Sequence, residues 1–266
     1  MSIALKKITL LTLAIVAPAI SHATNYEIRL PSGATQSVVV EEAAPAGPTF
    51  TAEESQTAWS SFLSYHGATY TTAGFSIRSI GIANAASEES LYAGDGKFPN
   101  EALPDSVFTG NIFFDNNNLT QINGLSGLVS ADHLFIYNNA LVNVDSLSSL
   151  TTLTGNLRAY GNQLTNVDGL SSLSFVNGAV LLYDNKLTNI DGLSSLAFVG
   201  GTLDLTTNAL LTDVSGIASV ATASSVALDA RDYSVKAPAN SPFCLAVGSG
   251  VALMSGYAVK AQLCEA

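Results

Sequence analysis

Between residues 111 and 235 the hydrophobic positions follow a short pattern that recurs about every 23 residues. Each copy reads apolar-x-apolar-x-x-Asn-x-Leu, as in Leu134-Phe-Ile-Tyr-Asn-Asn-Ala-Leu141. Alternation over so few positions predicts a short β-strand with one side buried. Strands that recur at a fixed period stack into a parallel sheet, and a return segment must separate each strand from the next. Five copies begin at Ile112, Leu134, Leu157, Val180 and Leu203, and a degenerate sixth carries Arg231 in place of asparagine.

The return segments carry apolar residues at constant offsets from the strands. No single turn of such a chain can bury these residues alone, so the rows predict one continuous core shared by neighbouring turns. The fifth turn contains one extra residue, which moves its core positions to Val214, Ile217 and Val220. The regular rows are Ile122, Val144, Val167 and Ile190, then Leu125, Leu147, Leu170 and Leu193, then Leu128, Leu150, Leu173 and Leu196.

Two return segments are almost identical, and they carry a family resemblance. They read Leu-Thr-Asn-Val-Asp-Gly-Leu-Ser-Ser-Leu (164–173) and Leu-Thr-Asn-Ile-Asp-Gly-Leu-Ser-Ser-Leu (187–196). Together with the strand pattern, these segments resemble leucine-rich repeats of the short bacterial and receptor L-domain kind. The resemblance covers roughly half of the chain. It implies an α/β solenoid with a short parallel sheet of about six strands.

The repeated asparagines are expected to be structural. Each side-chain amide stands where a strand bends into a loop, where it can bond backbone groups that the bend leaves unpaired. A second row, Asp145, Asp168 and Asp191, precedes short turns whose first amides these carboxylates are predicted to cap. A calcium ladder is the alternative, although one carboxylate per turn supplies too few oxygens. The asparagine ladder comprises Asn117, Asn139, Asn162, Asn185 and Asn208.

The first 23 residues have the features of a signal peptide. Lys6 and Lys7 precede an apolar run, and Ser21-His22-Ala23 fits a cleavage site before Thr24. We therefore expect an exported protein that is secreted, periplasmic or at the cell surface. Residues 24–50 are rich in proline and glycine and are interpreted as a linker with one short strand.

Atypical segments flank the repeats and are interpreted as caps. Thr51 and Glu54 form a capping-box pattern that opens a helix running to about Tyr65. Its apolar face, with Trp59, is predicted to cover the first end of the stack. Irregular strands are expected over 74–104. We assign residues 51–110 to the N-terminal cap, 111–235 to the solenoid and 236–266 to the C-terminal cap.

Cys244 and Cys264 are the two cysteines of the chain. In an exported protein they predict a disulfide that locks the C-terminal cap, and a redox pair is the alternative. A zinc site would require more cysteine or histidine nearby. The uncharged stretch 243–259 has the length of a marginal membrane span, but glycine and serine interrupt it, so a buried cap is favoured.

The charge of the chain indicates which classes of partner it does not bind. The formal net charge is −11, and removal of the two lysines of the signal peptide changes it to −13. The basic residues are scattered singly, which argues against nucleic acid and anionic membranes as partners. Neither a cofactor nor a metal ion is expected.

Alternation also predicts which side chains the sheet presents to solvent. Three consecutive turns place a tyrosine in register, beside phenylalanines, one arginine and one histidine. This composition is enriched at protein interfaces, and aromatic rows also bind sugars; stabilisation of the sheet alone is the other interpretation. The candidate binding residues are Phe113, His133, Phe135, Tyr137, Arg158, Tyr160 and Tyr183.

These observations predict a non-enzymatic module that binds an extracellular or cell-surface protein or glycan. No nucleophile elbow, phosphate loop or metalloprotease motif is found in the sequence. The alternatives are a carbohydrate-active enzyme that uses Asp184 with Asp204 or Asp115, and a structural envelope protein. Ice binding would need a regular threonine array, but Val142 and Leu211 interrupt the row.

Overall fold

In the computed structural model, residues 20–29, 35–43, 51–78, 98–249 and 251–265 are described. They belong to two compact units, residues 1–49 and 50–266. In the first unit, β1 (Ile20–Arg29) pairs antiparallel with β2 (Thr35–Ala43), so this region holds two strands and not the single strand expected in the linker. Most of the expected signal peptide lies outside the described residues, and its cleavage site falls within β1.

The second unit begins with α1 (Ala52–Tyr65), which confirms the predicted helix. Thr51 caps the helix: its Oγ1 accepts a hydrogen bond from the Glu54 amide, and the Glu54 carboxylate accepts one from the Thr51 amide. Trp59 is fully buried on the inner face of α1 and contacts Phe75, Phe98 and Phe114. The helix thus covers the first turns with a cluster of aromatic rings.

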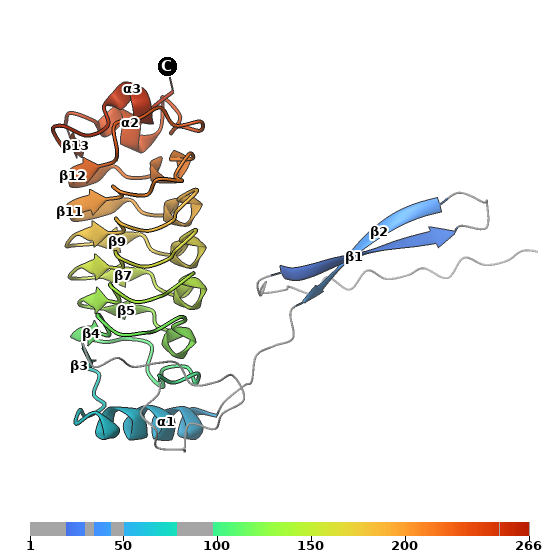
Figure 1. The fold of residues 1–266 in the computed structure, drawn as a ribbon, viewed down its shortest axis with the longest axis vertical. Helices are drawn as coiled ribbons and strands as arrows, with labels where there is room; N and C mark the ends of the chain where they lie inside the picture. Colours follow the sequence, from blue (N-terminus) through green and yellow to red (C-terminus); the bar gives the residue numbers. More distant parts are fainter. Residues whose placement is uncertain (1–19, 30–34, 44–50, 79–97, 250, 266) are drawn as a thin grey trace, which may run out of the picture. The chain divides into compact units, whose positions relative to one another are not determined.

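The repeats form a parallel sheet in which each strand pairs with the strand one repeat further along the chain (Figure 1). Leu134, for example, pairs with Ile112 on one side and Leu157 on the other. This first ladder consists of β3 (Gly74–Ser76), β4 (Asn111–Phe113), β6 (Leu134–Phe135), β8 (Leu157–Arg158), β10 (Val180–Leu181), β11 (Phe198–Asp204), β12 (Thr222–Ala227) and β13 (Val251–Leu253).

A second parallel ladder runs beside the first and was not predicted. Its strands lie just before those of the first ladder in each turn, and both ladders join in β11 and β12. Within the described residues the sheet therefore has 11 strands, and the expectation of about six is wrong. The caps extend the first ladder through β3 and β13, and each middle turn contributes two strands. The additional strands are β5 (Ser130–Ala131), β7 (Thr152–Leu153) and β9 (Phe175–Val176).

The return side of each turn is a short 3₁₀ helix, and all three predicted core rows are buried between it and the sheet. The displaced residues Val214, Ile217 and Val220 of the fifth turn are buried as well. A single, parallel sheet of many strands with few helices and a shared core is compatible with a solenoid. The 3₁₀ helices are η2 (Asn123–Leu125), η3 (Asp145–Leu147), η4 (Asp168–Leu170), η5 (Asp191–Leu193) and η6 (Ser215–Ile217).

From η3 to η6, successive 3₁₀ helices approach one another too closely for a side chain at the second residue of the later helix. A Cβ atom on Gly169 would lie 1.9 Å from the Val144 carbonyl oxygen, and one on Gly192 would lie 1.8 Å from that of Val167. Such distances are far inside van der Waals contact, so only glycine fits here. The Asp-Gly pair of the repeat therefore sets how tightly the return side packs.

The last turn is covered by α2 (Pro242–Ala246) and α3 (Lys260–Leu263), at the opposite end of the stack from α1 (Figure 1). Cys244 and Cys264 form the predicted disulfide, with a Cα–Cα distance of 5.9 Å. The stretch 243–259 forms part of this cap, with Phe243 and Ala258 buried. Among the described residues, no helix is long and apolar enough to span a membrane.

Candidate binding surface

The predicted aromatic face consists of two neighbouring columns of side chains on the first ladder. One column follows the outward position inside each strand, and the other lies two residues further along the chain. The inward neighbours Ile136, Ala159 and Leu182 are buried. From the first repeat to the fifth, the first column is Phe113, Phe135, Arg158, Leu181 and Asp204, and the second is Asp115, Tyr137, Tyr160, Tyr183 and Thr206.

The tyrosine column is a continuous stack of rings. The ring centroids of Tyr137 and Tyr160 lie 4.5 Å apart at 13° between planes, and those of Tyr160 and Tyr183 lie 4.4 Å apart at 8°. All three side chains are half-buried. The parallel register places the rings one above another, and the contacts between ring faces support the alignment of the strands.

In the first column, unlike the tyrosine column, the contacts centre on one buried ring, that of Phe135. Phe135 is only 7% exposed, which corrects its prediction as a residue that contacts a ligand. Phe113 stacks on one face of its ring at 4.4 Å, and the Arg158 guanidinium lies 4.4 Å from the ring centroid. Phe135 is covered because its neighbours in the column belong to turns on both sides. It therefore supports Arg158, and Phe113 and Arg158 remain half-buried at the surface.

Arg78 belongs to this surface but was not predicted. The alternation rule placed Asp115 outward, yet Asp115 is fully buried by an ion pair of 2.6 Å with Arg78. The hydrogen bond to Asp115 raises the pKa of Arg78 further above its ordinary value. Arg78 also donates a hydrogen bond of 2.9 Å to the Tyr137 hydroxyl and lies over the Phe113 ring. The register of β3 with β4, which lies outside the repeats, brings it here.

His133 stands at the start of β6, beside the first column. Its ring centroid lies 5.4 Å from that of Phe135. Its Nδ1 accepts a hydrogen bond of 2.8 Å from the Asn156 amide, which assigns the ring proton of the neutral form to Nε2. Nε2 lies 3.9 Å from an Asp132 carboxylate oxygen, which is too far for a hydrogen bond. The histidine is therefore fixed in orientation, with an N–H on its far side.

The asparagine ladder lies behind the tyrosine column and is structural. The amide nitrogen of Asn162 donates to the carbonyl oxygens of Ile136, Ala159 and Tyr160, and its oxygen accepts from the Leu141 amide. The other four asparagines donate in the same manner to their own turn and to the preceding one. In the sixth copy, Arg231 donates instead to the carbonyls of Asn208 and Ala209.

The predicted capping role of the aspartate row is wrong. No side chain of Asp145, Asp168 or Asp191 caps its 3₁₀ helix. The asparagine two residues earlier accepts the hydrogen bond from the aspartate's backbone amide instead. Asn166 Oδ1, for example, accepts from the Asp168 amide at 3.1 Å. The carboxylates line up along the return side, where partial desolvation and the charge of Asp168 raise the pKa of Asp145. No group of metal ligands is found among the described residues.

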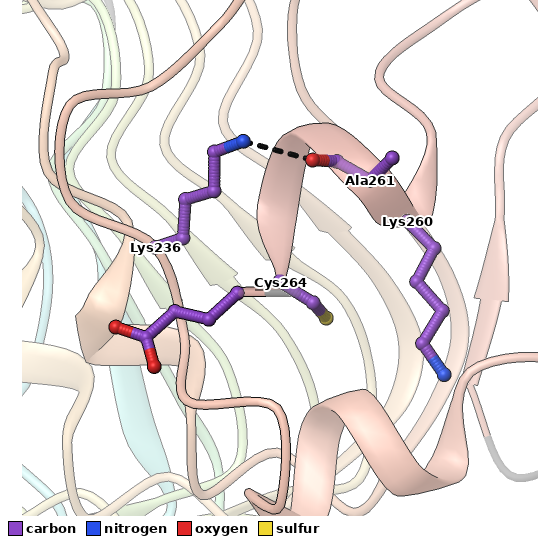
Figure 2. A pocket seen from close by; sticks show the side chains of 5 residues that line it. Lys236, Lys260, Ala261 and Cys264 are labelled. Carbon is purple, nitrogen blue, oxygen red and sulfur yellow. Dashed lines mark hydrogen bonds between the residues drawn. The ribbon is translucent and has the colours of Figure 1, made fainter.

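Two further features could contact a ligand and were missed. Phe175 and Phe198 stack at 4.8 Å on the second ladder, each half-buried. At the C-terminal cap, a cavity of about 390 Å³ is lined by Lys236, Lys260 and the disulfide residue Cys264. Lys236 Nζ donates to the Ala261 carbonyl at 2.8 Å across this cavity, as Figure 2 shows. The sequence did not reveal the phenylalanine pair, because β9 is a two-residue strand and shows too little alternation. It did not reveal the cavity, because the C-terminal cap does not follow the repeat.

Comparison with protein-family profiles, curated proteins and solved structures found no match.

Proposed function

We propose that this protein is an exported, non-enzymatic binding or adhesion module that recognises a protein or glycan through the aromatic face. The observation that carries the proposal is the in-register stack of Tyr137, Tyr160 and Tyr183 beside a half-buried arginine. Aromatic residues and arginine are the types that contribute most binding energy at protein interfaces. A solenoid presents them on one continuous surface that no single turn could provide.

Several features support a leucine-rich repeat solenoid as the scaffold. The strands pair one repeat apart, the leucine rows are buried, and the asparagines satisfy the backbone at each corner. These are the physical roles that a leucine-rich repeat assigns to its leucine and asparagine positions. The disulfide between Cys244 and Cys264 fits an oxidising compartment outside the cytoplasm, as the expected signal peptide requires.

The three carboxylates that an enzyme would use, Asp115, Asp184 and Asp204, give less support to catalysis than the aromatic face gives to binding. Asp115 is buried and paired with Arg78, so it has no access to a substrate. Asp204 accepts hydrogen bonds from the amide and hydroxyl of Thr206. Asp184 is exposed, in a left-handed conformation with φ of 53° at the corner of its turn.

The proposal is tested with the mature chain, residues 24–266, labelled and incubated with intact cells and with a panel of polysaccharides. We expect binding without release of new reducing ends. Serine at positions 137, 160 and 183 should weaken that binding by more than tenfold, because each aromatic anchor can contribute about 2 kcal/mol. Reducing ends that disappear in Asp184→Asn would establish the enzyme instead.

A matched control uses the other stacked aromatic pair. Phe175→Ser with Phe198→Ser removes rings of the second ladder and leaves the tyrosine column intact. We expect this variant to bind like the wild type. If it loses binding and the tyrosine variant does not, the binding surface lies on the second ladder. If neither cells nor polysaccharides are bound, the structural-envelope alternative gains support.

A further inference from the structure

The ring stack determines which part of each tyrosine a ligand can reach. Tyr160 has Tyr137 on one face at 4.5 Å and Tyr183 on the other at 4.4 Å, so both of its faces are in contact. A sugar ring has no access to a covered face. The reachable parts are the ring edges, which carry positive potential, and the hydroxyl groups. The tyrosine column therefore presents hydrogen-bond donors and not a flat apolar platform.

Arg158 adds a cation whose hydrogen-bonding capacity is unused. Its guanidinium carbon lies 4.4 Å from the Phe135 ring centroid, and Phe113 stacks on that ring from the strand on the other side. Within the described part of the chain it makes no hydrogen bond and no ion pair, and its Nε is buried without an acceptor. A planar guanidinium fixed on a ring, with free N–H groups, is suited to a carboxylate.

Neighbouring groups add further donors around Arg158. The ring proton of His133 is on Nε2, because Nδ1 accepts from the backbone. The Tyr137 hydroxyl accepts from Arg78, so its own hydrogen is free to donate outward. Burial, with contributions from Tyr183 and Tyr137, raises the pKa of Tyr160 to about 12, and its phenol stays protonated at neutral pH. The surface is complementary to a group that only accepts hydrogen bonds.

We infer that the aromatic face binds an acidic side chain of a protein partner, with the carboxylate on the Arg158 guanidinium. The half-buried Leu181 is the next residue after Arg158 in the same column and receives an apolar neighbour of that acidic residue. This inference depends on the proposed function, in which this face is the binding surface, and it names the chemistry of the partner.

Charge favours a protein over an acidic polysaccharide. The whole chain carries a formal net charge of −11, so a polyanion is repelled by most of its surface. The other arginine of the face, Arg78, is already neutralised by Asp115. Among the two arginines of this face, only Arg158 is unpaired within the described residues, and one such cation matches one carboxylate set in an apolar or basic surface. A chain of uronic acids offers many carboxylates, and its sugar rings find both faces of Tyr160 covered.

The test selects phage-displayed random peptides on the immobilised mature chain. We expect the selected peptides to share a Glu or Asp next to an aromatic or aliphatic residue. A synthetic consensus peptide should lose affinity about ten- to hundredfold on Arg158→Gln, and equally when its own acid is replaced by the amide. Both changes together should cost no more than either alone, because they remove the same contact. Arg158→Lys should bind with intermediate affinity, since it keeps the charge but loses the fork.

Lys186→Gln is the matched control, since it removes one exposed positive charge outside the two columns and should leave peptide affinity unchanged. Selected peptides without acidic residues, or peptides that bind Arg158→Gln as tightly as the wild type, would overturn the inference. Polygalacturonate bound through Arg158 in preference to the peptides would also overturn it. If the triple tyrosine variant loses the peptides and Arg158→Gln does not, the binding surface stands and the acidic partner is wrong. If neither variant changes binding, both proposals are wrong.

Discussion

The asparagine ladder and the tyrosine column are two residues apart in the same repeats, and each provides one side chain per turn. Asn162 is 3% exposed and makes four hydrogen bonds to backbone groups. Tyr160 is half-buried and contacts chiefly other tyrosines. Both rows recur in register, the asparagines in five turns and the tyrosines in three, so recurrence alone does not separate a structural role from the proposed binding role. Burial and the identity of the hydrogen-bond partner do.

The largest effect is expected from Asn162→Ala. This change leaves three carbonyl groups and the Leu141 amide without their partner in a buried corner, which should cost about 3 kcal/mol or more. Urea unfolding of the purified mature chain measures the loss. Asn166→Ala is the control, because it removes a single exposed bond to the Asp168 amide and should cost about 1 kcal/mol. If both variants lose the same free energy of unfolding, the asparagine ladder contributes no more to stability than an exposed hydrogen bond does.

The asparagine ladder ends at the last turn, where Arg231 replaces asparagine and the cap beyond carries the disulfide. The contribution of the asparagine ladder to stability can therefore be compared with that of a covalent bond. Cys244→Ser with Cys264→Ser opens a loop with a sequence separation of 20 residues. Loss of the loop constraint should lower the free energy of unfolding by about 3 kcal/mol. Hydrogen exchange should show the loss first in α2 and α3. Uniform loss of protection along the chain would mean that the cap and the repeats unfold as one unit.

A smaller effect on stability is expected from the triple tyrosine-to-serine variant at positions 137, 160 and 183. Loss of the ring contacts should cost about 1–2 kcal/mol in total. Urea unfolding compares this variant with Asn162→Ala. The three substitutions in the tyrosine column should lower the free energy of unfolding by less than the one substitution in the asparagine ladder. A cost above that of Asn162→Ala would make the tyrosines primarily structural.

The smallest effect is expected from the aspartates of the return side. Desolvation, then the charges of Asp213 and Asp168, raise the pKa of Asp191, as desolvation and Asp168 raise that of Asp145. Because the folded chain then holds these protons more tightly than the unfolded chain, stability falls as the pH rises above 3.8. Asp168→Asn removes the neighbour they share, so it should stabilise the protein at pH 7 by about 0.5 kcal/mol. Thermal unfolding across this pH range should show a shallower decline than in the wild type.

The periodic part of the molecule could be predicted from the sequence because each core position occurs in several copies. The buried leucine rows, α1 and the disulfide followed from such patterns or from well-defined local signals. Arg78 could not be predicted, because it reaches Asp115 through the pairing of a strand outside the repeats. The burial of Phe135 depends on neighbours in two other turns. The capping role was assigned to aspartate because a preference for residue types does not fix which of two polar side chains, two residues apart, accepts the amide hydrogen bond.

The contact between a glycine at the second position of a 3₁₀ helix and the carbonyl of the preceding turn has a consequence for how such a chain can change over time. Gly169 meets Val144, Gly192 meets Val167 and Gly216 meets Ile190 in the same way. A unit of one period that keeps this glycine and the asparagine finds the same contacts above and below it wherever it is inserted. Gain or loss of a whole period would lengthen or shorten the exposed row of tyrosines in fixed steps and leave both caps unchanged. The number of turns in the proposed binding surface can therefore change without a change in the side chains that each turn presents.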